Sequence, residues 1–172
     1  MSYDPQFAKI GEVLVHEGLI TEKELESALS EQKNKKDKLG NTLVSQGVIT
    51  EDELATAFSL QANCKKLTED ELLKAPEEIV KLIPEDFARQ NNILALKKTS
   101  DSIYVAIEDP EDVSTLDAIK KLVNLKPEVF VSGKTAIKNA IDQLYERVKK
   151  SGEVESAISN ISIIKGDDED SD

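Results

Sequence analysis

The sequence contains few residue combinations that could perform chemistry on a substrate. A Gly-Lys-Thr triplet at 133–135 stands between an expected strand and an expected helix, like the end of a phosphate-binding loop. Such a loop also needs a glycine five residues before the Gly-Lys pair, where this chain has Glu128. The expected strand runs directly into Gly133, which leaves no loop to surround a phosphate. We therefore interpret the triplet as a strand-to-helix turn.

The other reactive side chains lack partners of the right type. His16 is the single histidine and Cys64 the single cysteine, which excludes multi-histidine and multi-cysteine metal centres and an internal disulfide. We expect His16 on the surface and Cys64 half-buried at a junction between lobes. The acidic run 108–112 lacks the alternating spacing of a calcium loop, so it predicts a turn and a helix N-terminus. The sequence thus predicts no catalytic residue, no metal and no cofactor, and hence a protein that is not an enzyme.

Two Lys-x-Gly pairs, Lys9 with Gly11 and Lys38 with Gly40, are more informative. The second pair ends a lysine cluster at 33–38, the densest positive segment of the chain. Glycine inside a helix costs up to about 1 kcal/mol, so its use at both positions needs a reason. Either a flat or charged ligand approaches the backbone there, or two helices pack closely. The sequence leaves both explanations open.

These pairs belong to an internal repeat. Residues 9–32 and 38–61 align without a gap, with 13 identities in 24 positions and a period of 29 residues. Each copy predicts two short helices joined at Gly18 or Gly47, the second helix opening with a Thr-x-x-Glu capping box. Asp4-Pro5 is expected to start the first helix. A short amphipathic pair cannot bury its own apolar face, so we expect the two pairs to cover each other.

The chain changes character after the repeat. Short helical segments are expected from Thr68 to about Asn91, and the patterns that follow predict strands at 93–99, 102–108 and 128–132 and helices at 113–124 and 134–150. The predicted fold class is α+β. It comprises a helical lobe from the duplicated helix pair at 1–66, a small α+β lobe at 67–150 with a short sheet covered by helices, and an acidic, mostly disordered tail at 151–172.

Composition restricts the partners. The chain has 172 residues and a net charge of −12, and residues 151–172 alone hold one basic and seven acidic side chains. This charge argues against binding to DNA or RNA. No apolar run reaches the roughly 18 residues of a membrane span, and the N-terminus does not have the layout of a secretion signal. We expect a cytoplasmic protein without membrane insertion.

The two copies resemble the tandem motif RLGxxLVxxGxITxxQLxxALxxQ, with its five-residue spacer. This motif is found in the N-terminal domain of the general secretory pathway protein E and type IV pilus assembly ATPases. Residues 82–122, from LIPEDFARQ to LDAIKKL, resemble the second half of that domain, and the whole resemblance covers about 5–147. It implies a regulatory or docking module of a type II secretion or type IV pilus system, here without the ATPase, whose partners would be secretion or pilus assembly proteins.

Some members of this family bind cyclic di-GMP, and two equal half-sites would suit this near-symmetric nucleotide. Transferred by position, the resemblance implies a first half-site of Lys9, Ile10, Gly11, Leu14, Val15, Gly18, Leu25, Leu29 and Gln32. The second half-site would be Lys38, Leu39, Gly40, Leu43, Val44, Gly47, Leu54, Phe58 and Gln61. In this picture apolar side chains cushion the guanines, glycines admit them, and glutamines form hydrogen bonds.

Three departures from the motif bear on the ligand. Lysine replaces the motif's arginine in both copies, Ile10 replaces a leucine in the first, and Phe58 replaces a leucine in the second. Lysine retains the charge but lacks the planar fork that pairs with guanine. The alternative is therefore a protein-protein interaction adaptor that has kept the fold and lost nucleotide binding.

The first prediction concerns the Gly-Lys-Thr triplet. Because no phosphate loop surrounds it, Lys134→Ala should change neither the fold, followed by circular dichroism and thermal melting, nor ATP turnover, which should stay at background in both proteins. ATP hydrolysis by the unmodified chain that disappears in the variant would contradict this assignment.

Overall fold

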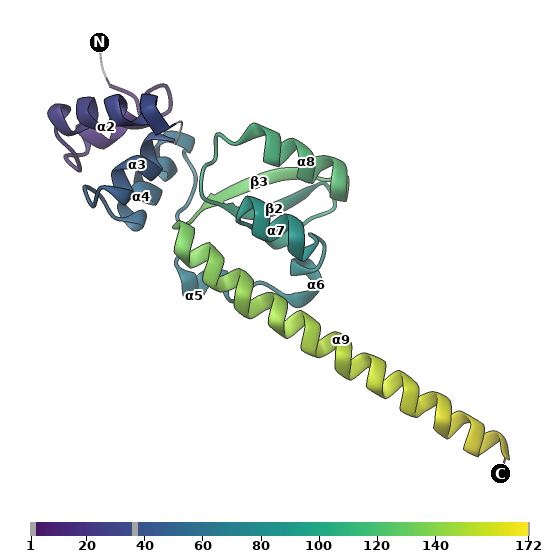
Figure 1. Cartoon of the computed structure of the whole chain (residues 1–172). Coiled ribbons are helices and arrows are strands. Elements are labelled where there is room, and N and C mark those ends of the chain that lie inside the picture. Colours follow the sequence, from purple (N-terminus) through teal and green to yellow (C-terminus); the bar gives the residue numbers. More distant parts are fainter. Residues whose placement is uncertain (1–2, 36–37, 172) are drawn as a thin grey trace.

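The computed structural model describes residues 3–35 and 38–171, and side chains within 3–32 and 38–152. Two lobes follow each other along the chain, a helical lobe and a lobe built on a three-stranded sheet (Figure 1). The predicted α+β class, with a helical N-terminal part, is confirmed.

The helical lobe contains α1 (Ile10–His16), α2 (Glu22–Lys35), α3 (Leu39–Ser45) and α4 (Glu51–Ala62). Helix α1 packs on α4 and α2 packs on α3, so each copy of the repeat covers the other, as expected. Gly18 and Gly47 join the helices of each pair with φ angles of +74° and +75°, which glycine adopts without a steric penalty. The expected capping boxes form at Thr21 and at Thr50.

One helix start was predicted wrongly. Asp4 and Pro5 form a separate turn, in which Asp4 Oδ1 accepts a hydrogen bond from the Gln6 amide at 3.0 Å. Lys9 then adopts an extended backbone and is the N-cap residue of α1, which begins at Ile10. The Asp4 carboxylate can accept a hydrogen bond from a nearby backbone amide either as a helix N-cap or in a turn. The turn provides this hydrogen bond without lengthening α1.

The second lobe contains α5 (Glu69–Leu72), α6 (Glu77–Val80), α7 (Glu85–Asn91), β1 (Ile93–Lys98), β2 (Ser102–Ile107), α8 (Val113–Val123), β3 (Lys126–Val131) and α9 (Lys134–Ser171). Strands β1 and β2 form the expected antiparallel hairpin, and β3 lies parallel to β2 after the α8 crossover. Helices α6, α7 and α9 pack on β1, and α8 packs on β3. Successive buried residues in β1 and β2 indicate that both faces of the sheet are covered.

The last helix runs further than predicted. The sequence predicted its end at 150, whereas the backbone of α9 is helical to Ser171. The helical spacing of Val154, Ile158 and Ile161 continues the pattern of the preceding turns. The disorder expected for 151–172 falls mostly on residues whose side chains lie outside the described part of the chain, and it stays a prediction. Within 3–35 and 38–171, no helix has the length and apolar character needed to cross a membrane.

The two lobes are joined by backbone pairing and by a shared helix cap. The Leu67 amide donates to the Val131 carbonyl at 2.8 Å, and the Val131 amide donates to Lys65 at 3.0 Å. The Val131 side chain is fully buried in the core of the helical lobe. From the first turn of α4, the Glu51 carboxylate accepts hydrogen bonds from the amide and hydroxyl of Thr135 at 2.7 and 2.9 Å. A side chain of the helical lobe thus caps the N-terminus of α9.

This cap can be tested with a control that the repeat itself supplies. Glu22 occupies in the first copy the position of Glu51, but it makes no hydrogen bond or ion pair among the described side chains. Glu51→Ala should lower the free energy of unfolding by about 1–2 kcal/mol through loss of the cap. Glu22→Ala should cost only a few tenths of that amount. It loses the favourable charge at a helix start, which Glu51→Ala also loses, but it breaks no cap. Equal effects in urea unfolding would contradict a role for Glu51 between the lobes.

Candidate ligand-binding site

A groove of about 550 Å³ lies between the helical lobe and the start of α8. It brings together residues of both predicted half-sites, namely Ile10, Gln32, Lys38, Leu39, Gly40 and Phe58. The opposite wall comes from the α+β lobe, in the segment from Asp109 to Ser114. The two copies of the repeat therefore meet at one surface, as a shared ligand would require.

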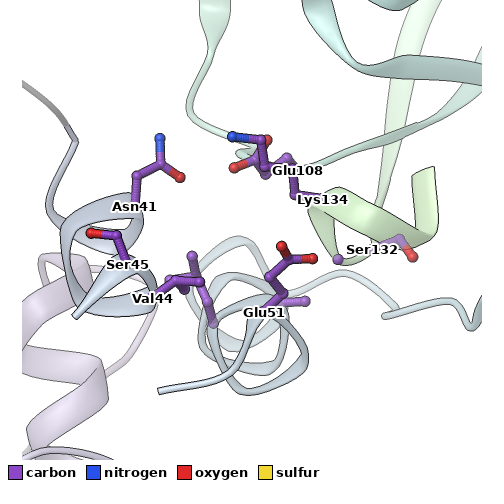
Figure 2. A pocket seen from close by; sticks show the side chains of 10 residues that line it. Asn41, Val44, Ser45, Glu51, Glu108, Ser132 and Lys134 are labelled. Carbon is purple, nitrogen blue, oxygen red and sulfur yellow. The ribbon is translucent and has the colours of Figure 1, made fainter. Parts of the chain in front are cut away.

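Two smaller cavities adjoin this groove and share residues with it or with each other. One, of about 220 Å³, includes Lys38, Gly40 and Phe58 and extends to Leu54 and Glu108. The other, of about 150 Å³, lies between the lobes and is shown in Figure 2. There Asn41, Ser45 and Glu51 of the helical lobe lie opposite Glu108, Ser132 and Lys134 of the other lobe (Figure 2). This cavity thus combines polar side chains from both lobes with apolar ones, Val44, Leu54 and Ala55, from the helical lobe.

Other predicted site residues hold the repeat together. Leu14 and Leu43 are fully buried in the helical core, and Gly18 and Gly47 form the turns between helices. None of these four residues lines the groove. They sit at equivalent positions because both copies need the same core and the same turn.

Close packing accounts for the two remaining glycines, Gly11 and Gly40. A Cβ atom on Gly11 would lie 2.7 Å from Leu25 Cδ1, and one on Gly40 would lie 2.8 Å from both δ carbons of Leu54. Each glycine thus lets the next helix of its own copy pack closely. Of the two explanations that the sequence left open, close packing is the one that the structure exhibits. Gly40 also lines the groove, so packing and access to a ligand are compatible at that position.

The last predicted residues differ in exposure. Lys9 and Leu29 are exposed, Val15 and Val44 are half-buried, and Gln61 is buried. The Gln61 Nε2 donates to the Ala8 carbonyl at 3.0 Å, while its buried Oε1 has no hydrogen-bond partner among the described residues. Gln61 does not line the groove, whereas Gln32, its equivalent in the first copy, does.

Charge is distributed unequally between the two half-sites. The Nζ of Lys38 lies 3.1 Å from Asp109 Oδ2 in the other lobe. Burial lowers the pKa of Lys38, but the hydrogen bond to Asp109 and nearby carboxylates such as Asp112 raise it, and the net pKa lies above the ordinary value. Lys9 makes no ion pair among the described side chains. Burial also raises the pKa of Glu108 in the cleft, despite the opposing charges of Lys134 and Lys38.

Sequence reasoning missed the acidic wall of the groove. The expected turn and helix start are confirmed, since Asp109 accepts from the Glu111 amide at 2.9 Å and Asp112 from the Thr115 amide at 3.3 Å. Their position opposite Lys38 was not predicted. The only available signal was the Asp-Pro strand end in the family pattern, which says nothing of a contact with the repeat.

His16, Cys64 and the Gly-Lys-Thr turn lie where the sequence predicted. The side chain of His16 is 54% exposed, and its ring stacks on Tyr3 with centroids 3.6 Å apart. Cys64 is half-buried against the helical core, and burial raises the pKa of its thiol. At the Gly-Lys-Thr turn, the Glu51 carboxylate occupies the helix end where a phosphate would bind. The described part of the chain contains no cluster of three or more His, Cys, Asp or Glu side chains that could hold a metal.

Known proteins similar to this chain include a much larger one. The type IV pilus assembly ATPase PilB of Myxococcus xanthus (strain DK1622) is 28% identical over 160 residues. The alignment covers 93% of this chain and 27% of PilB, so the chain spans about a quarter of that relative's length.

Two solved structures have a similar fold. A structure of MshE with cdg superposes with a TM-score of 0.71 at 27% identity, covering 80% of this chain and 99% of that one. The N-terminal domain of XpsE superposes with a TM-score of 0.68, covering 83% and 96% of the two chains. Its identity of 18% supports the fold alone.

The sequence model of the MshEN domain matches residues 65–151, which is half of the chain. The match begins at the junction between the lobes and runs through the sheet into α9. The PilB alignment, over 93% of the chain, includes most of the helical lobe as well. The chain therefore belongs to the MshEN domain family.

Proposed function

We propose that this chain is a non-catalytic, cytoplasmic module that binds cyclic di-GMP and regulates, or docks onto, a type II secretion or type IV pilus assembly system. The observation that carries the proposal is the groove in which Ile10 and Gln32 of the first copy meet Lys38, Gly40 and Phe58 of the second. The structural similarity to MshE with cdg adds support. A nucleotide with two guanines and two phosphates would contact both copies at once.

The chemistry of the groove fits such a ligand. Ile10, Leu39 and Phe58 offer apolar and aromatic surface to a guanine, and the amide of Gln32 can hydrogen-bond its edge. Lys38 supplies a positive charge for a phosphate, and Lys9 directly precedes Ile10 at the groove. The volume of about 550 Å³ lies within the usual range of about 300–1,000 Å³ for small-molecule sites.

One observation favours the second candidate, a protein-interaction adaptor. Asp109, Glu111 and Asp112 face the groove and would repel the phosphates of the nucleotide. The adaptor would use the same fold to contact secretion or pilus proteins without a nucleotide.

Calorimetric titration separates the two candidates. One molecule of cyclic di-GMP should bind per chain. The double variant Lys9→Arg and Lys38→Arg should bind it more tightly, because the planar fork of arginine is restored. A lost bidentate base contact costs roughly 1–3 kcal/mol, which is about 5- to 150-fold per position. Gln32→Ala should weaken binding, whereas Gln143→Ala, an exposed glutamine on α9 away from the groove, should not.

The outcomes distinguish the hypotheses. Binding by the double arginine variant alone would favour the adaptor, with the groove as a relic of a nucleotide site. Failure of both proteins to bind would remove the nucleotide from the proposal and leave the glycines a packing role only.

A further inference from the structure

The equivalent lysines of the two copies have different surroundings. Lys9 is exposed and unpaired among the described side chains. Lys38, 29 residues later, contacts Asp109 at 3.1 Å, across the boundary between the lobes. The Asp109 side chain is only 19% exposed, so water screens this ion pair less than it screens an open surface pair. The repeat is symmetric in sequence, and the second lobe makes it asymmetric in charge.

Cavities lie between the lobes near Lys38, and the lobes are joined more firmly elsewhere. Their linings combine polar residues such as Asn41, Glu108 and Asp112 with apolar ones such as Leu54 and Phe58. At the other end, Val131 is buried in the helical core and pairs with the backbone of 65–67. Loss of the Lys38–Asp109 contact would thus free the start of α8 while the backbone connection stays in place.

We propose that Asp109 and a ligand phosphate compete for Lys38, so that binding in the groove releases the β2–α8 segment from the helical lobe. One lysine cannot neutralise a phosphate and Asp109 together, and Glu111 and Asp112 add further negative charge beside them. The inference rests on the proposed function, because it assigns regulation to the same site. Ligand binding in the groove would thereby alter the contact between the two lobes.

The first test compares two acidic residues that both line the groove. Asp109→Asn and Glu111→Gln each remove one negative charge, but only Asp109 is bonded to Lys38. Asparagine can also keep the turn that Asp109 forms with the Glu111 amide. In calorimetric titration, Asp109→Asn should bind cyclic di-GMP about 3- to 10-fold more tightly than Glu111→Gln. This gain should disappear in a Lys38→Met background, since the two residues then have no contact to lose.

The second test needs no ligand. Hydrogen-deuterium exchange of the amides at 109–116 should be at least about threefold faster in Asp109→Asn and in Lys38→Met than in the unmodified chain. Lys9→Met and Glu111→Gln, the matched controls, should leave exchange unchanged.

Each result has a separate meaning. If the unmodified chain binds the nucleotide but Asp109→Asn binds no better than Glu111→Gln, competition is wrong and the proposed function stands. Weaker binding by Asp109→Asn would overturn the inference in favour of Asp109 positioning Lys38 for the ligand. If no variant binds, the proposed function fails and competition fails with it. If exchange at 109–116 is unchanged in both Asp109→Asn and Lys38→Met, the release of this segment is wrong, whatever the titrations show.

Discussion

The attachment of Val131 to the helical lobe determines how the rest of the molecule is arranged. This residue ends β3, and its side chain is buried among the helices of the repeat while its amide and carbonyl pair with Lys65 and Leu67. One residue therefore belongs to a strand of one lobe and to the core of the other. Since α9 begins three residues later, its N-terminus lies against α4, where Glu51 caps it. The same attachment carries β2 and the start of α8 to the second copy of the repeat, which creates the groove.

Duplication and asymmetry have different origins in this chain. Each copy places a leucine over a glycine, Leu25 over Gly11 and Leu54 over Gly40, and each turns at a glycine with positive φ. These features follow from one helix-pair plan used twice. From the α+β lobe, Asp109 pairs with Lys38 and Thr135 donates to Glu51, and both of these partners belong to the second copy. Positions that are equivalent in sequence therefore acquire different partners. A near-symmetric ligand would meet two chemically unequal halves.

The places of the motif residues in the structure show why a family resemblance does not by itself assign a function to each residue. Leu14 and Leu43 match the motif, yet they are fully buried and serve the core. Lys38 matches it as a cation, yet its charge is already shared with a carboxylate from another lobe. Gln61 also matches the motif, yet its side chain is buried, and its Oε1 has no hydrogen-bond partner among the described residues. The motif thus combines positions needed for folding with positions available to a ligand.

The sequence by itself determined the elements whose causes are local. Thr50 and Glu53 are three residues apart, so their capping box could be read directly, and Gly47 could be assigned to a turn because only local sterics matter there. Asp4-Pro5 was misplaced because a single turn satisfies the same local preference as a helix start. Only the tertiary structure decided that Asp109 faces Lys38 and that Glu51 caps α9. These partners lie 71 and 84 residues apart, and their contacts depend on how buried apolar surfaces such as Val131 orient whole lobes, which no local pattern of charges encodes.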